Sequence, residues 1–417
     1  MRAAVIGGGV VGAACACSLL DVADEVVLLE AGVVGGGASR GNAGWVTPSL
    51  AMPLASPGVL RSGLRAALDP RGALIIRPSL DPSWMRWLIR FARNSRPAVF
   101  EQGIRALLGM TLRSLDELDR LREVGVQFEE HRAGLLAVAR DRAGMHWFDG
   151  TFAALRAQGF PGGLESMDGR AARELEPSLG AAVGWAVRAD IDRHVSPESL
   201  VAGLAEHLRT RGGTVREQAA VHGLRRIPQG WALDGDAGEL ERVDVVVLAS
   251  ALGTAALVEP FGLRVPIVGA KGYSVTVRVA GARPAMSLYL CEPKLGVTPL
   301  AAGLRVAGYF ELGARNAEPS AARARQLVED SVPFLPALEG QPPLEGPAGW
   351  AGFRPSTPDS LPLIGPVPGA PGVLLATGHG MLGVTLAPAT GVAVAALVRG
   401  ERPDWVAPFA PSRFGRR

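Results

Sequence analysis

The sequence has few cysteines, no large excess of one charge and no long uninterrupted apolar run. Three cysteines in 417 residues are too few for a disulfide scaffold or a four-thiolate zinc site. Lysine and arginine together number 43 against 40 acidic residues, a net charge of +3, which does not favour nucleic acid as a partner. No apolar stretch of 18 or more residues is free of charge or glycine, so no transmembrane helix is predicted. The N-terminal residues lack the long apolar centre of a signal peptide, which predicts a cytoplasmic location.

The composition supplies enough apolar residues for a sizeable core. Hydrophobic residues make up 48% and charged residues 20%, which excludes a wholly disordered chain. The length predicts two or three domains, or one large interleaved fold. Glycine and proline number 54 and 32, so the fold is expected to be rich in turns and loops.

The first thirty residues contain a dinucleotide-binding pattern. An apolar segment at residues 3–6 predicts a buried strand, which leads into a turn, a helix and a second apolar strand at residues 25–29. The turn reads Gly7-Gly8-Gly9-Val10-Val11-Gly12, which fits G-x-G-x-x-G. Strand, glycine turn, helix and strand in this order are the context in which the motif binds a dinucleotide.

Each position of this motif has a physical role. Gly7 makes the tight turn, Gly9 lets the backbone approach a pyrophosphate, and Gly12 lets helix and strand pack closely. The helix N-terminus offers free N–H groups and a partial positive charge to the phosphates. Glu30 ends the second strand, where it can accept hydrogen bonds from both ribose hydroxyls and disfavours the 2′-phosphate of NADP. These residues do not distinguish FAD from NAD.

Residues 36–44 form a second glycine-rich segment soon after Glu30. Because of that position, the segment is expected to return to the phosphate end of the cofactor. Ser39 and Asn42 offer a hydroxyl and an amide, and the glycines leave backbone donors bare. A plain flexible loop is the alternative.

The segment from Trp84 to Arg93 mixes aromatic and aliphatic residues with Arg86 and Arg90. On a helix these residues would form a basic amphipathic face. Two interpretations remain open: the helix packs on its own domain, or it makes a peripheral contact with a membrane. Nucleic acid is the least favoured partner, because the net charge is low.

The middle of the chain predicts that the first domain is completed by later sequence. A helix is predicted over residues 196–213, since Ser196 can cap it. Strands are predicted at residues 214–221 and 243–249, the second of them fully buried. Residues 265–310 alternate in short strands, which suggests a mixed or antiparallel sheet.

The sequence therefore predicts an α/β fold with two domains. A discontinuous, Rossmann-like FAD-binding domain is expected to contain residues 1–57, 190–262 and 345–417. A substrate-binding domain with a mixed or antiparallel sheet is expected to contain residues 58–189 and 263–344.

The C-terminal part of the chain adds three motifs in close succession. They read Trp350-Ala351-Gly352-Phe353-Arg354-Pro355, Leu361-Pro362-Leu363-Ile364-Gly365-Pro366 and Thr377-Gly378-His379-Gly380-Met381-Leu382-Gly383. An apolar helix follows to about residue 398. A second glycine-rich turn that leads into a helix N-terminus can stabilise the negative charge that builds on a flavin ring.

Together these motifs carry a family resemblance. The chain resembles FAD-dependent amino-acid oxidoreductases of the D-amino-acid oxidase superfamily, and its pattern is closest to the D-amino-acid dehydrogenase small-subunit group and glycine oxidase. The matching pieces are GGGVVG with Glu30, the SRGNAG loop with Thr47-Pro48, Lys271-Gly272-Tyr273-Ser274, WAGFRPSTPD, LPLIGP and TGHGMLG. They run in order from residue 1 to about residue 400, so the resemblance covers nearly the whole chain.

The resemblance implies that FAD occupies the nucleotide site and that Arg354 binds the substrate carboxylate. A guanidinium suits that role because it can hold a carboxylate through two parallel hydrogen bonds; a structural ion pair is the alternative. The resemblance also implies that residues 380–383 line the pyrimidine side of the flavin and that the backbone of Val221 touches the adenine end. The residues expected at the cofactor are Gly7, Gly9, Val10, Val11, Gly12, Glu30, Ala31, Ser39, Gly41, Asn42, Ala43, Gly44, Val221, Ala249, Gly253, Gly352, Arg354, Gly378, His379, Gly380, Met381, Leu382, Gly383, Val384 and Thr385.

The sequence departs from the family's pattern at the substrate. In glycine oxidase a tyrosine helps to hold the carboxylate, and Gly296 lies near that place here. Tyr273, Tyr289 and Lys294 are the candidates to replace it. This departure affects the choice of substrate and leaves the reaction type unchanged.

Two histidines are further candidates for the site. His379 is expected to form a hydrogen bond to the flavin or the backbone, and His194 to face the substrate, with a packed or surface position as its alternative. No protein base is required if the amine binds in its neutral form, which desolvation by the pocket favours.

The resemblance implies an enzyme that oxidises a small amino acid, in particular a D-amino acid such as D-proline or hydroxyproline. Hydride would move from the α-carbon to the flavin, and electrons would pass to a quinone or another acceptor, at the inner face of the cell membrane. One alternative is an oxygen-using oxidase for glycine, sarcosine or a similar amine. The other is a non-catalytic FAD-binding subunit of a hetero-oligomer. No metal is expected, and the oligomeric state is left open.

Overall fold

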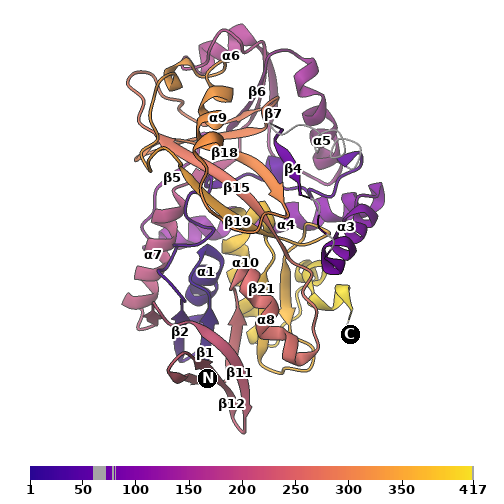
Figure 1. The fold of residues 1–417 in the computed structure, drawn as a ribbon, viewed down its shortest axis with the longest axis vertical. Coiled ribbons are helices and arrows are strands. Elements are labelled where there is room, and N and C mark those ends of the chain that lie inside the picture. Colours follow the sequence, from indigo (N-terminus) through magenta and orange to yellow (C-terminus); the bar gives the residue numbers. More distant parts are fainter. Residues whose placement is uncertain (60–71, 78, 80, 416–417) are drawn as a thin grey trace.

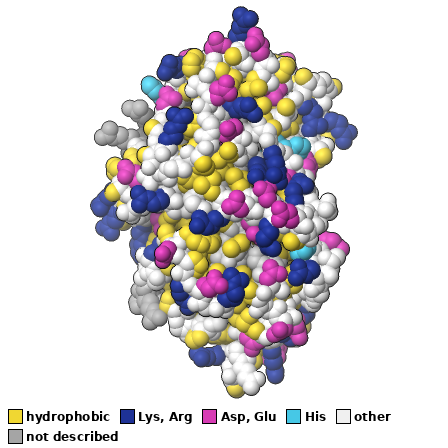
Figure 2. Space-filling view, turned by 180° about the vertical axis from the view of Figure 1, so that it is seen from behind, with side chains coloured by type: hydrophobic (Ala, Val, Ile, Leu, Met, Phe, Trp, Pro, Cys, Tyr) yellow, Lys and Arg dark blue, Asp and Glu magenta, His cyan; other side chains and the backbone are white. Residues whose placement is uncertain are grey.

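Two large sheets, one above the other, make up most of the fold (Figure 1). The structure is a computed structural model, and it describes residues 1–59, 72–77, 79 and 81–415. Acidic and basic side chains are interspersed over the face of the molecule that Figure 2 shows.

The lower sheet collects strands that lie far apart in the sequence. Its order is β10-β2-β1-β14-β21-β20. The strands are β1 (Arg2–Ile6), β2 (Glu25–Leu29), β10 (Thr214–Arg216), β14 (Val245–Leu248), β20 (Leu363–Pro366) and β21 (Val373–Thr377). Neighbours pair in parallel except β20 and β21. The central strands are almost wholly buried, as expected when both faces of a parallel sheet are covered.

Helices α1 (Val10–Leu19), α7 (Pro197–Thr210) and α10 (Gly383–Val398) share one hydrophobic core with this sheet. Small residues let α1 and α10 approach closely. A Cβ added to Gly391 would lie 2.6 Å from the Ala14 carbonyl oxygen of α1. Because both helices are buried between other elements, neither has the amphipathic pattern of a surface helix.

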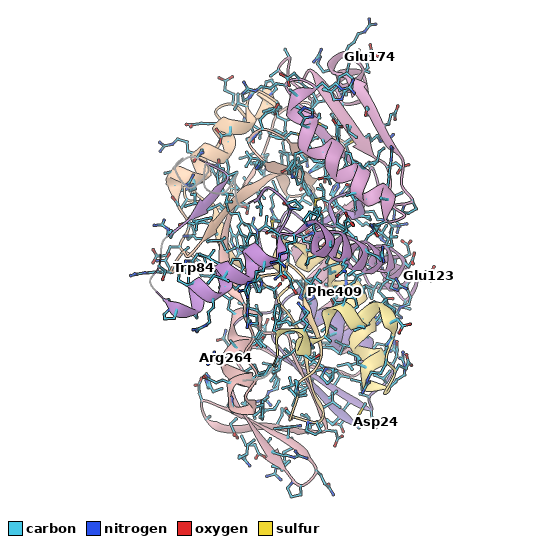
Figure 3. All side chains as sticks on the ribbon, turned by 90° about the vertical axis from the view of Figure 1, so that its right-hand side faces the viewer. Asp24, Trp84, Glu123, Glu174, Arg264 and Phe409 are labelled. Carbon is cyan, nitrogen blue, oxygen red and sulfur yellow. The ribbon has the colours of Figure 1, made fainter. Side chains whose placement is uncertain are left out.

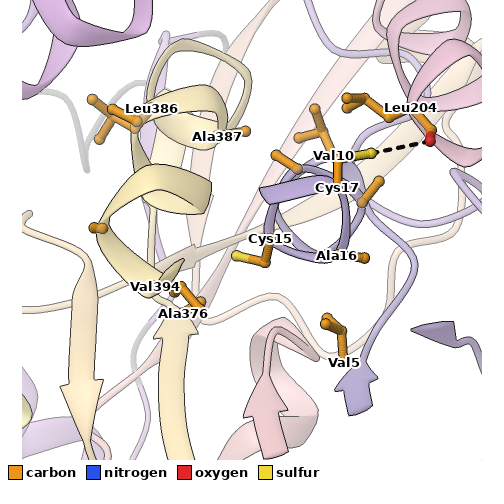
Figure 4. Packing of buried hydrophobic residues seen from close by; sticks show 14 of the residues in the cluster. Val5, Val10, Cys15, Ala16, Cys17, Leu204, Ala376, Leu386, Ala387 and Val394 are labelled. Atoms are coloured by element: carbon orange, nitrogen blue, oxygen red, sulfur yellow. Dashed lines mark hydrogen bonds between the residues drawn. The ribbon is translucent and has the colours of Figure 1, made fainter. Parts of the chain in front are cut away.

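The core between α1 and α10 also holds two of the three cysteines (Figure 4). All three are buried and free. The Cys17 thiol donates a hydrogen bond to the Leu204 carbonyl of α7 at 3.1 Å. Burial raises the pKa of Cys17 to about 12, so this thiol stays protonated and unreactive at neutral pH.

A small antiparallel sheet and a short helix cover the other face of the lower sheet. They are β11 (Val221–Ile227), β12 (Gly230–Gly235), β13 (Gly238–Val243) and α8 (Thr254–Val258). The hairpin of β11 and β12 projects at the bottom of the molecule (Figure 1).

The upper sheet has nine strands, mostly antiparallel. Its order is β19-β15-β18-β17-β16-β6-β8-β7, with β4 beside β18. The strands are β4 (Leu74–Ile76), β6 (Leu135–Ala139), β7 (Leu164–Asp168), β8 (Trp185–Ala189), β15 (Val268–Val277), β16 (Ser287–Leu290), β17 (Leu295–Leu300), β18 (Gly303–Leu312) and β19 (Trp350–Ser356). Helices α5 (His146–Ala157), α6 (Gly169–Leu175) and α9 (Ala321–Ser331) surround it.

Several elements lie between the two large sheets. Helices α3 (Pro82–Asn94) and α4 (Pro97–Glu123) are at mid-height in Figure 1, and α4 packs on α10. A three-stranded sheet joins β3 (Trp45–Val46), β9 (Arg193–Val195) and β5 (Glu130–His131). The short 3₁₀ helices are η1 (Pro48–Leu50), η2 (Ala143–Met145), η3 (Ala251–Gly253), η4 (Glu259–Phe261), η5 (Pro336–Leu338), η6 (Gly380–Leu382), η7 (Asp404–Phe409) and η8 (Pro411–Phe414).

The observed fold confirms the predicted α/β class with a discontinuous Rossmann-like part. The helix predicted from residue 196 is α7, and Ser196 caps it by accepting from the Ser199 N–H at 3.3 Å. The domain boundaries stay a prediction, and β19 pairs with β15 in the upper sheet although residues 345–417 were assigned to the nucleotide domain.

One segment, Gly380–Val398, is long and apolar enough to cross a membrane by length and composition. In the structure 67% of it is buried inside the fold, where α10 packs against α1 and α4. This burial is typical of the core helix of a globular protein.

Candidate active site

A cavity of about 460 Å³ opens at the carboxyl ends of β1, β2, β14 and β21. Ligands bind at this edge in open α/β sheets. Most residues predicted at the cofactor line it, namely Gly7, Gly9, Val10, Val11, Glu30, Ala31, Ser39, Asn42, Val221, Ala249, Gly253, Arg354, Gly378, His379, Gly380, Gly383 and Val384. The structure therefore brings three distant motifs to one cavity.

The glycine turn after β1 is shaped by close backbone contacts. Gly7 has a φ of +109°, which favours glycine, and an added Cβ would lie 2.7 Å from the Ala249 carbonyl oxygen. An added Cβ on Gly12 would lie 1.8 Å from the Gly7 oxygen. Both glycines are thus needed for the turn and for the close packing of α1 on the sheet.

The N-terminus of α1 faces the second glycine-rich loop. Its N-cap, Gly9, has no side chain to bond the free N–H groups. The Ser39 hydroxyl accepts from the Val10 N–H at 2.9 Å. The loop therefore lies against the helix N-terminus, as the sequence predicted, and an anion can be bound by both.

The carboxylate of Glu30 is held by the backbone around it. It accepts from the Gly8 N–H at 2.6 Å and from the Gly32 N–H at 2.8 Å, one bond to each oxygen. A carboxylate offers about four lone-pair positions, so both oxygens can still accept from a ribose. Glu30 lines the cavity, at the same end as Val221 and His222.

The loop of residues 36–44 is anchored by an ion pair between the buried Arg305 and the more exposed Glu198. Arg305 of β18 donates to Glu198 of α7 at 2.8 Å and to the Asn42 carbonyl at 3.0 Å. The Glu198 carboxylate also accepts from the Gly41 N–H at 3.2 Å. Burial would raise the pKa of Glu198, but its hydrogen bond with Arg305 holds the value below the usual range.

Several predicted cofactor residues do not line the cavity: Gly12, Gly41, Ala43, Gly44, Gly352, Met381, Leu382 and Thr385. Trp350 explains two of them, because an added Cβ on Gly41 or Gly352 would lie 2.3 Å from its ring. The indole thus packs the loop against the strand that carries Arg354.

The turn η6 brings the N-terminus of α10 to the cavity. Its N-cap, Leu382, offers no side-chain bond, and the first turn contains no acidic residue. Gly383 and Val384 line the cavity. The Thr385 hydroxyl donates to the Trp45 carbonyl at 2.7 Å, which fixes the helix start. The free N–H groups can therefore stabilise negative charge on a ligand ring.

His379 is buried and also lines the cavity. Its Nε2 lies 3.0 Å from the Thr390 hydroxyl, which itself donates to the Leu386 carbonyl at 2.8 Å. Nε2 must therefore carry the hydrogen and donate to Thr390. Burial lowers the pKa of His379 to about 3, so the ring is neutral at physiological pH.

Arg354 lies on β19 beside Ala270 of β15, and it too lines the cavity. Its guanidinium needs the glycine at position 272, because an added Cβ there would lie 2.1 Å from Nη1. Nη1 donates to the Tyr309 carbonyl at 2.7 Å, at an irregularity in the pairing of β15 with β18. Tyr309 has a φ of +59°, an uncommon conformation for a non-glycine residue.

The guanidinium of Arg354 forms no salt bridge with any residue in the described part of the chain. Burial lowers its pKa to about 10, so it remains charged at neutral pH. A buried cation without an acidic partner can be neutralised by a carboxylate ligand. The sequence analysis gave a structural ion pair as the alternative role of Arg354. Arg354 forms no such pair with the described residues.

The structure does not bring the predicted tyrosines to this cavity. Tyr273 donates to Glu311 at 2.7 Å, and its side chain packs in the core on the other face of the upper sheet. Tyr289 packs among aromatic rings, 6.2 Å from Trp45 and 5.2 Å from Phe148. Alternation along β15 turns Tyr273 away from Arg354, whereas Tyr289 is kept from the cavity by its packing among the aromatic rings.

His194 is also placed away from the cavity. It is fully buried, with Nε2 3.0 Å from the Pro299 carbonyl oxygen, and its ring stacks on His131 at 4.5 Å. Burial, with His131 beside it, lowers its pKa to about 4. This geometry corrects the expectation that His194 faces the substrate. His194 has the packed position that the sequence analysis gave as the alternative.

Some lining residues were missed by the sequence reading. Ser250 and Ala251 follow β14, and Thr377 ends β21. Each lies at the carboxyl end of a strand predicted as buried, a signal that could have indicated them. No group of three or more His, Cys, Asp or Glu residues that could hold a metal occurs in the part of the chain that the structure describes.

Comparison with known proteins gives the class of the protein. The family model described as FAD dependent oxidoreductase (DAO) matches residues 2–397. A D-amino acid dehydrogenase of Cereibacter sphaeroides is 34% identical, with 97% of this chain and 93% of that protein covered. A D-amino acid dehydrogenase of Dechloromonas aromatica is 32% identical, with 98% and 99% covered.

Solved structures agree on the fold. Glycine oxidase from Geobacillus kaustophilus has a TM-score of 0.77 at 24% identity, with 99% of each chain covered. L-proline dehydrogenase from P. horikoshii has a TM-score of 0.73 at 20% identity, with 99% of this chain and 97% of that chain covered. The chain belongs to the DAO family of FAD-dependent oxidoreductases.

The residues present fit FAD. The uncapped N-terminus of α1 suits the pyrophosphate, and Glu30 has acceptor positions left for the ribose hydroxyls. The uncapped N-terminus of α10 suits the flavin ring. The two helix ends and the acid open onto one cavity.

Proposed function

We propose that the protein oxidises the carbon–nitrogen bond of a small D-amino acid and passes the electrons to an acceptor other than oxygen. The observation that carries the proposal is Arg354, a partly buried guanidinium without an acidic partner among the described residues, in the cavity that fits FAD. The relatives named D-amino acid dehydrogenase support the choice of substrate class.

Arg354 binds the substrate carboxylate and so fixes the position of the α-carbon. Bound FAD supplies the acceptor for the hydride that leaves this carbon. The N-terminus of α10 stabilises the negative charge that accompanies the transfer. The resulting imino acid takes up water and releases ammonia and a keto acid, whereas a cyclic substrate such as D-proline gives a cyclic imine. Positioning is the main contribution of the chain.

The amine must lose its proton before it is oxidised. Glu30 is the only acidic residue among the described residues that line the cavity, and it lies at the adenosine end. His379 is a weak base, because burial lowers its pKa to about 3. Desolvation beside the Arg354 cation therefore selects the neutral amine, and no side chain is needed as a base.

We test this proposal with anaerobic visible spectra of the FAD-loaded protein after adding single D- or L-amino acids. Bleaching by a D-amino acid and not by its enantiomer is the expected result. Arg354→Ala is expected to lower kcat/KM about 100-fold or more, because each of the two charge-assisted bonds to the carboxylate contributes about 1.5–3 kcal/mol. Arg354→Lys keeps the charge without the planar fork and serves as the matched variant.

Other outcomes assign the alternatives. No bleaching with any amino acid or N-methyl amine would contradict the proposal and favour a non-catalytic FAD-binding subunit. Stoichiometric hydrogen peroxide in air would assign an oxygen-using oxidase of the glycine or sarcosine type. Reduction of a quinone in place of oxygen is the expected result.

A contact with the inner face of the cell membrane is part of the proposal. Helix α3 exposes Met85 and Ile89, at 48% and 49%, beside the exposed Arg86 and Arg93. This outer face has the apolar and basic character of a peripheral membrane helix. Loss of binding to anionic vesicles on Met85→Ser with Ile89→Ser is expected, and unchanged binding would exclude the contact.

A further inference from the structure

A small second pocket of about 30 Å³ adjoins the main cavity and shares His379 and Gly380 with it. Its walls are mainly apolar. They come from the segment after β3, from α3, from β18 and from η6, and include Met52, Leu54, Trp87, Phe91, Phe310 and Leu382.

The pocket lies next to Arg354. The guanidinium carbon is 5.7 Å from the centre of the Phe310 ring, and that ring is one wall of the pocket. A carboxylate bound to Arg354 places its α-carbon one bond away. The side chain on that carbon therefore starts between the cavity of Arg354 and this pocket.

The α3 wall is rigid because its aromatic residues stack at helical spacing. Trp84 stacks on Trp87 at 5.9 Å, and Trp87 on Phe91 at 5.2 Å. Trp87 is also fixed by a hydrogen bond from Nε1 to the Ser356 carbonyl at 3.2 Å. All three rings are buried. Figure 3 shows Trp84 on this helix, which crosses between the two large sheets.

The pocket offers no charged partner for a substrate side chain among the described residues. Its hydroxyls are engaged: Ser356 donates to the Arg354 carbonyl at 3.2 Å, Thr357 donates to the Leu361 carbonyl at 2.7 Å, and Ser360 accepts from the Ala55 N–H at 3.2 Å. A charged substrate side chain would therefore be desolvated here without compensation.

We propose that this pocket receives the side chain of the amino-acid substrate and limits it to a small apolar group. The space of about 30 Å³ accommodates one or two carbon atoms, and Phe91, Phe310 and Leu54 set the limit. This inference rests on the proposed function, and it makes the inner face of α3 part of the substrate site.

The test measures reduction of the bound FAD in single-turnover experiments without any acceptor. The substrates are glycine, D-alanine, D-2-aminobutyrate, D-norvaline, D-methionine and D-glutamate. For the wild type, the specificity constant of FAD reduction is expected to be about 10-fold or more lower for D-methionine than for D-alanine. One methylene changes the specificity constant about 10- to 200-fold in such pockets. D-glutamate is expected to be poorer than D-methionine.

Two variants change the pocket in opposite directions. Phe91→Leu enlarges the pocket and is expected to raise the ratio of the specificity constant for D-methionine to that for D-alanine about 10-fold. Leu54→Phe fills the pocket and is expected to lower the specificity constant for D-norvaline much more than that for glycine. Loss of folding cannot produce both changes. Trp84→Leu is the matched control, because Trp84 belongs to the same stack but does not line the pocket, so its ratio should equal that of the wild type.

Three results would overturn the inference. The first is an unchanged ratio in both pocket variants. The second is an equal shift in Trp84→Leu, because general loosening of α3 would then explain the effect. The third is a change confined to reoxidation by a quinone, which would assign the pocket to the acceptor. Wild-type protein that no amino acid reduces would instead contradict the proposed function itself.

Discussion

At the scale of single residues, the arginines of this protein show how partners decide function. Arg305 and Arg413 each bond an acidic residue at 2.7–2.8 Å. Arg354 has only a backbone carbonyl as a partner in the described chain. Desolvation of this guanidinium is unfavourable in the free protein. A bound carboxylate can offset that desolvation, so the contact can strengthen substrate binding.

The buried Asp192 predicts a dependence of stability on pH. Its carboxyl accepts hydrogen bonds from the hydroxyl and the N–H of Ser49. Burial raises the pKa of Asp192 to about 7, although these bonds oppose the rise. Between about pH 4 and 7 the folded protein keeps a proton that the unfolded chain has lost, because an ordinary aspartate has a pKa of about 3.9.

The stabilisation from this proton is complete below the unfolded pKa and is lost as the pH rises through about 7. Asp192→Asn, which stays neutral, is therefore expected to raise the free energy of unfolding at pH 8 by on the order of 1–4 kcal/mol and by less at pH 5. Denaturant unfolding at both pH values measures this. Asp116→Asn, on the exposed face of α4, is the control, and equal effects of the two variants would refute the assignment.

Residue positions were predicted well where a motif has one backbone geometry. Gly7, Gly12 and Glu30 occupy the places that the glycine motif predicts, because such a turn has few alternatives. Tyr273 and His194 were misplaced for a different reason. A residue type shows that a group can bond a substrate, but the pairing of strands decides which face it occupies.

At the scale of elements, α1 and α10 depend on glycine for their contact. An added Cβ at Gly391 would lie 2.5 Å from the Ser18 hydroxyl and 2.6 Å from the Ala14 carbonyl oxygen. The carbonyl is backbone and cannot move without shifting α1. Because both helix N-termini face the cavity, a shift between them would also alter the cofactor site.

Gly391→Ala is accordingly expected to lower the free energy of unfolding by about 1–3 kcal/mol and to weaken FAD binding. Gly150→Ala is the matched control, since Gly150 lies in α5 with no atom within 4 Å of an added Cβ. Higher helix propensity should stabilise that variant by about 0.5–1 kcal/mol. Chemical denaturation and FAD titration measure both effects, and a stable Gly391→Ala protein with normal FAD affinity would disprove the packing argument.

At the scale of the whole molecule, the cavity depends on contacts between the two large sheets. Arg305 comes from the upper sheet, Glu198 from α7 on the lower sheet, and both hold the loop at Gly41 and Asn42. The loop in turn meets the N-terminus of α1 through Ser39. The upper sheet therefore positions a cofactor loop that belongs to the lower part of the chain.

Arg305→Met is expected to raise the Kd for FAD about 10-fold or more, because truncation leaves Glu198 without its buried partner. Arg225→Met is the control, since Arg225 pairs with Asp234 and Glu239 on an exposed hairpin, where such pairs contribute about 0–1 kcal/mol. Fluorescence titration of apoprotein with FAD measures both. Equal Kd values for the two variants would show that the ion pair does not position the loop.

The sequence by itself determined the dinucleotide site and the residues of its motif, because these follow from local geometry: a glycine turn between a buried strand and a helix has few possible shapes. The class and the choice of FAD followed from the resemblance that the motifs carry together. The discontinuous course of the Rossmann-like part was also predicted from the sequence, because buried strands recur after a long intervening segment.

Only the tertiary structure decided which side chains meet at the cavity. Arg354 is unpaired because the face of β19 that it occupies meets Gly272 and Phe310 and no described acid. The inner face of α3 closes a pocket beside it, although the sequence indicated only an amphipathic helix. Such neighbours come from segments far apart in the chain, and their contacts depend on how sheets and helices pack and cannot be read from local sequence.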